Sequence, residues 1–347
     1  MSLWFRIILL RIVPFIFLGI LIIGAERLYF HIHTAVIDLG NKQTAWLFVP
    51  TGAGYTQVRD SLYLHKYICN RPLFENYTRL RHADIHFKPG GYLLKNRMSV
   101  HDLVEMLTRG LQTPVRVTFH NIRNREELSG KISRQIEADS LSLRKLMADK
   151  VYLKKYQVSP TTVFSLFIPN TYEMWWNTSA DQFLARMYRE SQAFWSGRRI
   201  RLADSIGLTR FQIVILASIV EKETSKDEEK PVIAGVYMNR LRKGYPLQAD
   251  PTLIFAWNDY TIKRVLNRHK EINSPYNTYR HAGLPPGPIC LPSISSIDAI
   301  LNYQHHNYLY FCAKEDFTGY HNFTNNLKEH NRNARKYQEA LRSKGIR

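Results

Sequence analysis

The chain is poor in cysteine, and the few cysteines it has lie far apart. Cys69, Cys290 and Cys312 are the three in 347 residues, and no Cys-X-X-Cys pair occurs. This number and spacing argue against a zinc site and against a disulfide framework. We expect three buried thiols. A single bridge from Cys290 to Cys69 or to Cys312 is the alternative in an oxidising compartment.

Motifs of several enzyme classes are missing as well. The chain has no Gly-X-Ser-X-Gly motif for a nucleophilic serine, and neither a P-loop nor a dinucleotide fingerprint. The paired histidines at residues 31 and 33, and at 305 and 306, lack the setting of metal ligands. We therefore expect neither a cofactor nor a metal ion.

Acidic residues are scarce: 29 Asp and Glu stand against 48 Lys and Arg, which gives a net charge of +19. Such an excess predicts a polyanionic partner, namely nucleic acid, anionic lipid or an acidic cell-wall polymer. The 45% of hydrophobic and 22% of charged residues are typical of globular proteins and exclude a disordered or collagen-like chain. The length suggests two or three domains.

Long apolar runs are absent after the first 25 residues, which excludes a polytopic membrane protein. Residues 7–25 are apolar except for Arg11, and as a helix they are long enough to cross a hydrocarbon core of about 30 Å. Together with Arg6, this charge predicts a cytoplasmic N-terminus for residues 1–6, by the positive-inside rule. A cleaved signal peptide and a buried core helix are the alternatives, but the possible cleavage site near Ala25 is crowded by isoleucines.

A single-pass anchor in the cytoplasmic (inner) membrane would place the rest of the chain outside the cytoplasm. A domain in that position does not meet chromosomal DNA, so we expect no nucleic-acid partner. The polyanions that it does meet are lipid headgroups and peptidoglycan, whose lactyl and stem-peptide carboxylates are negative. The basic composition therefore favours a protein of the cell envelope.

Hydrophobic periodicity and turn residues predict a mixed α+β fold. Strands are expected at residues 44–50, 92–94 and 115–119, and a hairpin at 308–313 and 320–324. A basic loop is expected at 197–201, and an aromatic loop at 164–172. Helices are expected at residues 58–69, 73–80, 100–107 after the N-cap Ser99, in two segments of 124–153, and at 178–195, 209–220, 230–243 and 326–343.

Glu221 directly follows the apolar helix predicted for residues 209–220. Ala217 and Ser218, one turn earlier, are small and leave room for a ligand. Partial desolvation at the end of such a helix raises the pKa of a carboxyl group, as a general acid requires. The simpler interpretation is an exposed, charged helix end.

Four further features have a structural or a functional interpretation. Asp250 precedes Pro251 and is expected to be a helix N-cap. Gln248 has no evident structural role and is expected to face a cleft. The loop at residues 276–289 is dense in Gly and Pro, which predicts either a rigid sugar-binding wall or a solvated connector. His321, on the predicted hairpin, is expected to be a structural histidine.

Eight sequence blocks follow one another in the C-terminal half of the chain. They are residues 217–224 (ASIVEKET), 236–241 (VYMNRL), 247–252 (LQADPT), 274–279 (SPYNTY), 283–289 (GLPPGPI), 308–311 (YLYF), 321–324 (HNFT) and 330–331 (HN). In their order and spacing these blocks resemble the membrane-bound endolytic murein transglycosylases, the YceG-like family. The resemblance covers roughly residues 5–345.

The N-terminal half is similar but less closely so. Residues 87–92 and 99–110 look like the LysM-like subdomain of the family. The chain departs from the family in two places: His120-Asn121 stands where Glu-Gly is usual, and Asn170 stands where Asp is usual. The mixed polar stretch at residues 26–43 predicts a stalk. The resemblance implies a LysM-like subdomain at 44–112, an intermediate region at 113–195 and a catalytic domain at 196–347.

The resemblance also implies a function. A lytic transglycosylase would cleave the MurNAc–GlcNAc bond of nascent peptidoglycan, leave a 1,6-anhydro end and so terminate strand growth beside the peptidoglycan synthases. Glu221 would be the acid and base. Alternatives are a non-catalytic wall-binding protein and a hydrolytic muramidase, which needs Asp250 as a second carboxylate. Candidates for positioning the substrate are Gln248, Asn239, Asp250, Tyr276, Asn277 and His321.

Overall fold

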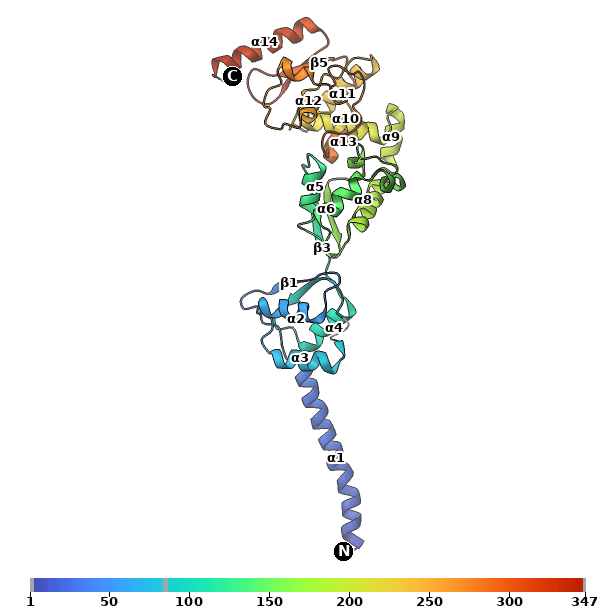
Figure 1. Cartoon of the computed structure of the whole chain (residues 1–347), viewed down its shortest axis with the longest axis vertical. Helices are drawn as coiled ribbons and strands as arrows, with labels where there is room; N and C mark the ends of the chain where they lie inside the picture. The colour runs from blue at the N-terminus through green and yellow to red at the C-terminus, as the bar shows by residue number, and fades with distance from the viewer. Residues whose placement is uncertain (1–2, 84–86, 346–347) are drawn as a thin grey trace. The chain divides into compact units, whose positions relative to one another are not determined.

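The computed structural model describes residues 3–83 and 87–345, and the chain forms two compact units. The N-terminal unit comprises Met1–Arg116 and Glu173–Thr178, and the C-terminal unit comprises Val117–Tyr172 and Ser179–Arg347. Both contain helices and short strands, so the architecture is mixed α/β, as expected. In the described part of the chain, the strands form three two-stranded sheets (Figure 1).

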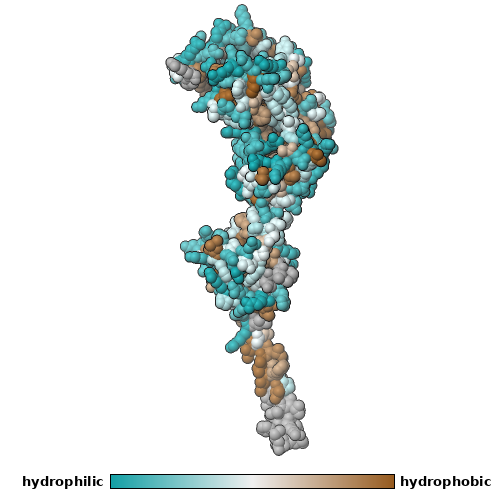
Figure 2. Space-filling model, in the orientation of Figure 1, coloured by the Kyte–Doolittle hydropathy of each residue, from teal (hydrophilic) through white to brown (hydrophobic). Residues whose placement is uncertain are grey.

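The N-terminal helix α1 (Leu3–Ile32) includes the apolar segment predicted from the sequence and continues beyond it. Its portion Val13–Ile32 is long and apolar enough to cross a membrane, and none of it is buried inside the protein. Figure 2 shows apolar surface on the coloured part of α1. Among the described residues, α1 is the one unbroken helix with this length and composition.

A small α/β arrangement makes up the rest of the N-terminal unit. Strand β1 (Thr44–Val49) pairs antiparallel with β2 (Gly90–Lys95). Alternate side chains of β1, Leu47 and Val49, point into the core, because successive residues of a strand face opposite sides. The strands pack with three helices, α2 (Tyr55–Leu64), α3 (Arg71–Leu80) and α4 (Val100–Arg109).

The first end of α4 confirms the N-cap that was predicted at Ser99. The Ser99 hydroxyl accepts a hydrogen bond from the Asp102 backbone N–H, as an N-cap does. Gly110 ends the helix with a φ of 73°, in the left-handed region that glycine adopts without strain. Local sequence therefore determines both boundaries of this helix.

The segment 173–178 returns to the N-terminal unit through Trp176. The Trp176 ring stacks on Phe48, with centroids 4.8 Å apart. A Cβ atom at Gly91 would lie 2.9 Å from Trp176 Cβ, so only glycine lets the indole pack over β2. This long-range contact is not visible in the hydrophobic pattern of the sequence.

Residues 115–194 contain more regular structure than the sequence suggested. Strand β4 (Asn170–Met174) pairs with β3 (Val115–Phe119), where an aromatic loop was expected at residues 164–172. Asn121 has a φ of 53°, which asparagine tolerates in place of the glycine usual in the family. The helical elements are α5 (Arg125–Ile132), α6 (Ser140–Ala148), α7 (Lys150–Leu153), the 3-10 turns η2 (Lys154–Tyr156) and η3 (Val163–Leu166), and α8 (Ala180–Phe194).

The second part of the C-terminal unit is built around α10 (Arg210–Glu223). Residues 213–220 of α10 are all buried, as predicted, and the helix packs against α11 (Lys230–Arg242) and α13 (Ile294–Leu301). The basic loop expected at 197–201 is instead the start of α9 (Arg198–Ile206), because arginine is a good helix former and Ala203 anchors the helix in the core.

The remaining elements surround this core (Figure 1). Helix α12 (Asp250–Trp257) and the 3-10 turn η4 (Asn267–Glu271) precede the long Gly- and Pro-rich loop. The predicted hairpin is confirmed as β5 (Tyr310–Ala313) and β6 (His321–Thr324). The predicted last helix is confirmed as α14 (Leu327–Ser343).

All three cysteines are free thiols, so the alternative of a bridge from Cys290 is not observed. Cys290 is buried, and burial raises the pKa of its thiol to about 12. Cys312 is partly buried. Cys69 is exposed, contrary to the expectation of three buried thiols, because it lies on a turn just before the N-cap of α3.

Candidate functional site

A cavity of about 530 Å³ lies within the C-terminal unit, and we name it the Glu223 pocket. Its wall comes from the C-terminal end of α10, from α11 and α12, from the β5–β6 hairpin and from α14. Its size is within the range of ligand sites. The charged, histidine, amide and tyrosine residues that line it are Glu223, Asp250, Arg240, Lys270, His321, His330, Gln248, Asn331, Tyr237, Tyr279, Tyr310 and Tyr337.

Glu223 is the last residue of α10, and its side chain is half-buried. The Tyr237 hydroxyl donates a hydrogen bond of 2.5 Å to Glu223 Oε1. Burial raises the pKa of Glu223 to about 7; the charge of Asp250 also raises it, while Tyr237 and Arg240 oppose the shift. A carboxyl group whose pKa is raised toward neutrality can both donate and accept a proton near neutral pH, as a general acid and base requires.

Asp250 lies in the same pocket, and the prediction that it is an N-cap is wrong. The N-cap residue of α12 is Ala249, Asp250 is the first helical residue, and no side chain caps this end. The Asp250 side chain instead accepts a 2.5 Å hydrogen bond from the Tyr279 hydroxyl. Burial raises its pKa, against the effect of that hydrogen bond and of Lys270.

Arg240 provides a buried positive charge at the wall of the pocket. Its guanidinium donates to the carbonyls of Leu309 (2.7 Å) and Leu247 (2.9 Å), and to Gln248 Oε1 (3.1 Å). Gln248 has a φ of 53°, and it lines the pocket as expected. Arg240 therefore fixes the turn before α12 and, at the same time, places a cation near the two carboxyl groups.

Two histidines line the pocket in different states. Glu229 holds His321 in place. The Glu229 carboxylate accepts a 2.8 Å hydrogen bond from the His321 backbone N–H and a second one, also of 2.8 Å, from His321 Nδ1. His330, on α14, has a buried Nδ1 with no hydrogen-bond partner among the residues that the structure describes. A buried polar atom without a partner costs about 1–3 kcal/mol, so this nitrogen is suited to bind a ligand.

Glu221 does not line the Glu223 pocket. Residues two apart on a helix point to different faces, and the Glu221 carboxylate accepts hydrogen bonds from Ser293 and Ser296, both at 2.5 Å. Lys230 Nζ lies 3.3 Å from the same oxygen. Burial raises the pKa of Glu221, but these donors lower it by more, so the pKa is lowered overall. This carboxylate joins α10 and α11 to the start of α13.

The other expected substrate contacts are distributed unevenly. Gln248, Asp250 and His321 line the Glu223 pocket, whereas Asn239 and Asn277 brace the backbone. Asn239 Nδ2 donates to the carbonyls at residues 306 (2.6 Å) and 308 (3.0 Å), and Asn277 Nδ2 donates to those at 270 (2.8 Å) and 272 (2.9 Å). Tyr276 lines a different cavity of the same unit.

Sequence reasoning did not single out Glu223, Tyr237, Arg240 or His330 as site residues. Each of them lies in one of the blocks that resemble the family, so their positions were noted but no role was given. The available signal was the pair of glutamates in EKET. A helical projection turns these two residues to different faces, but it does not say which face meets the cavity.

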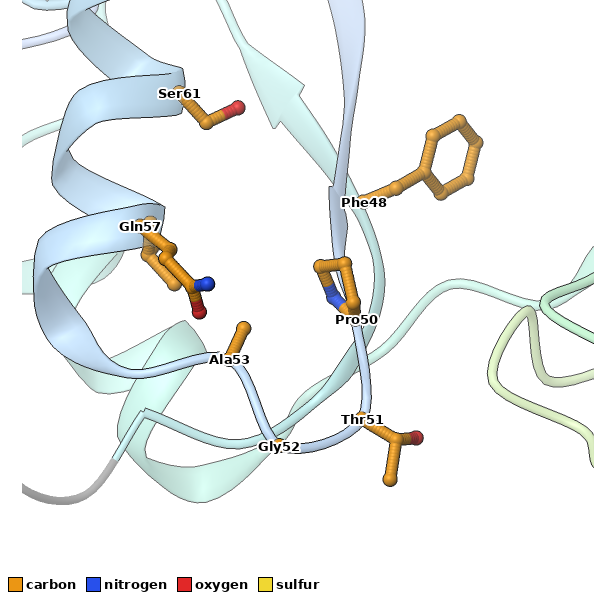
Figure 3. A pocket seen from close by; sticks show the side chains of 8 residues that line it. Phe48, Pro50, Thr51, Gly52, Ala53, Gln57 and Ser61 are labelled. Carbon is orange, nitrogen blue, oxygen red and sulfur yellow. The ribbon is translucent and has the colours of Figure 1, made fainter.

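A smaller cavity of about 360 Å³ lies in the N-terminal unit. In Figure 3, Gln57 and Ser61 point from α2 toward Pro50, and Phe48 points away from them on the other side of the strand. Gln57 Oε1 accepts a 3.0 Å hydrogen bond from the Gly54 N–H, which fixes its orientation. The wall thus offers amide and hydroxyl groups beside an apolar floor.

A carboxyl group with a raised pKa in a cleft is typical of enzymes that use acid–base catalysis. The chain matches the YceG-like family over residues 47–336 and belongs to that family. It is 27% identical to an endolytic murein transglycosylase of Bacillus subtilis over 342 residues, which are 93% of each chain.

A second relative and a solved structure are also similar to this chain. An endolytic murein transglycosylase of Streptococcus pneumoniae is 26% identical over 358 residues, which cover 92% of this chain and 63% of the relative. The crystal structure of a YceG-like protein from Listeria monocytogenes superimposes with a TM-score of 0.55 at 25% identity, covering 84% of this chain and 99% of that one.

Proposed function

We propose that the protein is an endolytic murein transglycosylase that cleaves the MurNAc–GlcNAc bond of nascent peptidoglycan and leaves a 1,6-anhydro end. Internal cleavage of this kind terminates strand elongation. The observation that carries the proposal is the carboxyl group of Glu223, whose pKa is raised to about 7 in a pocket of ligand size. The family, and relatives that carry this activity in their names, support it.

In this proposal Glu223, rather than Glu221, is the general acid and base. Protonated Glu223 donates its proton to the glycosidic oxygen as the bond from that oxygen to C1 of MurNAc breaks. The resulting carboxylate then accepts the proton of the C6 hydroxyl while O6 bonds to C1. One carboxyl group serves both steps, and no water is consumed.

Asp250, Arg240 and Tyr237 have supporting roles. The Asp250 carboxylate stabilises the positive charge that develops at C1 and keeps the pKa of Glu223 high. The Tyr237 hydroxyl orients Glu223 by its hydrogen bond to Oε1, which leaves Oε2 to face the substrate. Gln248 and His321 contact the sugars, and Asn239 and Asn277 keep the walls in place.

The position of Asp250 also favours a second candidate, a hydrolytic muramidase. Glycosidases that use water need two carboxyl groups in one cleft, and Glu223 and Asp250 both line this pocket. Mass spectrometry of purified glycan strands digested by the full-length protein separates the two reactions. We expect 1,6-anhydro ends; reducing MurNAc ends would establish the muramidase instead.

The apolar helix α1 suggests the place where the reaction occurs. We propose that α1 anchors the protein in the cytoplasmic membrane, with the rest of the chain outside the cytoplasm, beside the peptidoglycan synthases. Its length, composition and exposure support an anchor. A reporter that is active only outside the cytoplasm should work when fused after residue 40, and a soluble chain that begins near residue 26 would contradict the proposal.

We also propose that residues 44–112 form a LysM-like glycan-binding module, joined by residues 113–195 to the catalytic region at 196–347. The cavity between β1 and α2 supports this, because its amide and hydroxyl groups match a sugar (Figure 3). In the full-length protein, Gln57→Ala should weaken binding to glycan strands without changing the product end. Unchanged binding would indicate that this unit acts as a spacer.

A further inference from the structure

A second cavity of about 530 Å³ lies in the C-terminal unit, and we name it the arginine pocket. It shares no lining residue with the Glu223 pocket. Three segments that are distant in sequence form its wall: the start of α5, the turn around η3, and the region from α12 to the Pro-rich loop. The lining residues are Arg123, Asn124, Arg125, Glu126, Pro160, Thr161, Val163, Phe164, Phe255, Asn258, Tyr260, Tyr276 and Pro288.

Close packing holds these segments together. A Cβ atom at Gly287 would lie 2.1 Å from the Thr161 carbonyl oxygen, so the Pro-rich loop reaches the η3 turn only because residue 287 is glycine. The Leu291 N–H donates a 2.9 Å hydrogen bond to the carbonyl of Ile122, next to Arg123. The cavity is therefore a preformed feature of the unit.

The lining combines two arginines and one glutamate, Glu126, with aromatic surface. The Arg123 guanidinium lies 5.5 Å from the centroid of the Tyr260 ring, and Arg125 donates to the Met147 carbonyl at 3.4 Å. Neither arginine forms an ion pair within residues 3–83 and 87–345. Phe255 and Tyr276 pack with ring centroids 4.7 Å apart. Guanidinium groups bind carboxylates, and aromatic rings pack against the apolar faces of sugars.

Two elements connect the arginine pocket to the Glu223 pocket. Helix α12 begins with Asp250 in the Glu223 pocket, and near its other end Phe255 and the C-cap residue Asn258 line the arginine pocket. The loop after it contributes Tyr279 to the first and Tyr276 to the second. Eight residues of helix span about 12 Å, a distance that an oligosaccharide bridges and a single sugar does not.

We infer that the arginine pocket is a second binding site for the same glycan strand, away from the bond that is cleaved. Arg123 and Arg125 bind a carboxylate carried by a MurNAc residue, and Tyr260, Phe255 and Tyr276 pack against the sugars. The carboxylate belongs either to a stem peptide or to the free lactyl group of a MurNAc without a peptide. This inference rests on the proposed function and extends it.

The expected kinetic effect is a change in KM. A contact far from the reacting atoms is equal in the ground state and the transition state, so its loss raises KM and leaves kcat unchanged. The second site also favours internal cleavage, because a strand occupies both pockets only when it extends past the scissile bond. Short oligosaccharides that fill the Glu223 pocket alone should be insensitive to Arg123 and Arg125.

Binding measured on full-length protein carrying Glu223→Gln, in detergent, tests the inference. Arg123→Gln and Arg125→Gln are compared with the control Arg201→Gln, which removes the same charge from an exposed site on α9 outside both pockets. The probes are glycan oligomers of equal length: MurNAc–GlcNAc with stem peptides, the same without peptides, and uncharged GlcNAc oligomers. Circular dichroism confirms that each variant is folded.

Each pocket variant should weaken the binding of one MurNAc probe about fivefold to tenfold, the loss of roughly one charge-assisted hydrogen bond. The MurNAc probe whose binding is weakened shows whether the arginines bind a stem-peptide or a lactyl carboxylate. GlcNAc oligomers should bind equally to all variants. Equal binding of every probe to the pocket variants, or an equal loss in Arg201→Gln, would overturn the inference. Full turnover by Glu223→Gln would contradict only the assignment of Glu223 as the general acid, and reducing ends in the product would contradict the proposed transglycosylase reaction.

Discussion

Glu221 and Glu223 leave the same helix two residues apart, yet their carboxyl groups have opposite surroundings. Glu221 accepts hydrogen bonds from two serine hydroxyls and lies beside Lys230 Nζ, so its pKa is lowered although it is partly buried. Glu223 accepts one hydrogen bond, from Tyr237, and lies near another carboxyl group, so its pKa is raised to about 7.

The difference shows that burial alone does not make a carboxyl group an acid catalyst. Desolvation raises the pKa of both residues, and the number of donors decides the net direction. Glu221 remains charged and connects three helices. Glu223 keeps a proton that is available to a ligand, because its surroundings satisfy the carboxylate less well than those of Glu221.

The largest expected effect comes from Glu223→Gln. The amide keeps the shape of the side chain and its bond from Tyr237 but has no proton to transfer, so kcat should fall by a factor of about 10² to 10⁴. Release of 1,6-anhydro muropeptides from purified strands is the measurement. Strand binding should persist. A variant that still binds strands but no longer releases product would argue against a purely non-catalytic binding role for the unaltered protein.

Glu221→Gln is the matched comparison, since it makes the same chemical change two residues earlier. Its turnover per folded molecule should stay within about tenfold of the wild type, because Glu221 does not line the pocket. If Glu221→Gln were inactive and Glu223→Gln active, the assignment of the general acid would revert to the one suggested by the sequence alone.

Glu221→Gln should reduce the stability of the protein more than Glu223→Gln does, which is the reverse of the order expected for activity. Glu221→Gln removes the negative charge that faces the buried Lys230 ammonium, whose side chain is 6% exposed. Loss of one partner from a buried pair costs about 3–5 kcal/mol, and we expect about 2–4 kcal/mol here because Asp227 still contacts Lys230. Urea unfolding at pH 7 measures this difference.

The pH dependence of that loss follows from the lowered pKa of Glu221. The stabilisation is present above the pKa of the unfolded state, about 4.5, and disappears as the pH falls through the folded-state value. The difference in free energy of unfolding between wild type and Glu221→Gln should therefore become smaller in acid. A gap that does not depend on pH would mean that packing, rather than charge, is lost.

Glu223→Gln should stabilise the protein at alkaline pH. The raised pKa of Glu223 means that ionisation opposes folding: this penalty is absent below about pH 4.5, where both states are protonated, and is fully present above about pH 7. The variant should gain about 1–3 kcal/mol at pH 8 and nothing at pH 4. Thermal unfolding at the two pH values shows whether the gain has this sign.

Much of the fold was predictable because local signals determine it. The caps at Ser99 and Gly110, the apolar residues of α10, and the turn at Gly319 mark their elements directly. Strand β4 was missed, because its pairing with β3 is a long-range contact. The start of α9 was interpreted as a loop because several adjacent arginines indicate exposure but not conformation.

The site was predictable as a region but not as a set of atoms. The blocks at residues 217–224 and 247–252 do meet at one pocket. Which glutamate faces it depends on where Ser293 and Ser296 lie, and these serines are some 70 residues away in sequence. For the same reason, Asp250 was interpreted as an N-cap, since nothing in the sequence shows that Tyr279 binds it.

The smallest expected effect comes from Asp250→Asn, which alters the Glu223 pocket without touching Glu221. In the wild type, kcat/KM should decline as the pH rises through about 7, because the free enzyme must hold the proton on Glu223. Removing the neighbouring charge lowers the pKa of Glu223, so the decline should begin at lower pH, while the rate in acid falls only a few-fold. Rate profiles from pH 5 to 8 on purified strands measure both.

An unchanged profile would show that Asp250 does not influence Glu223. A loss as large as that of Glu223→Gln, with reducing ends in the product, would instead show that Asp250 is the second carboxylate of a hydrolase.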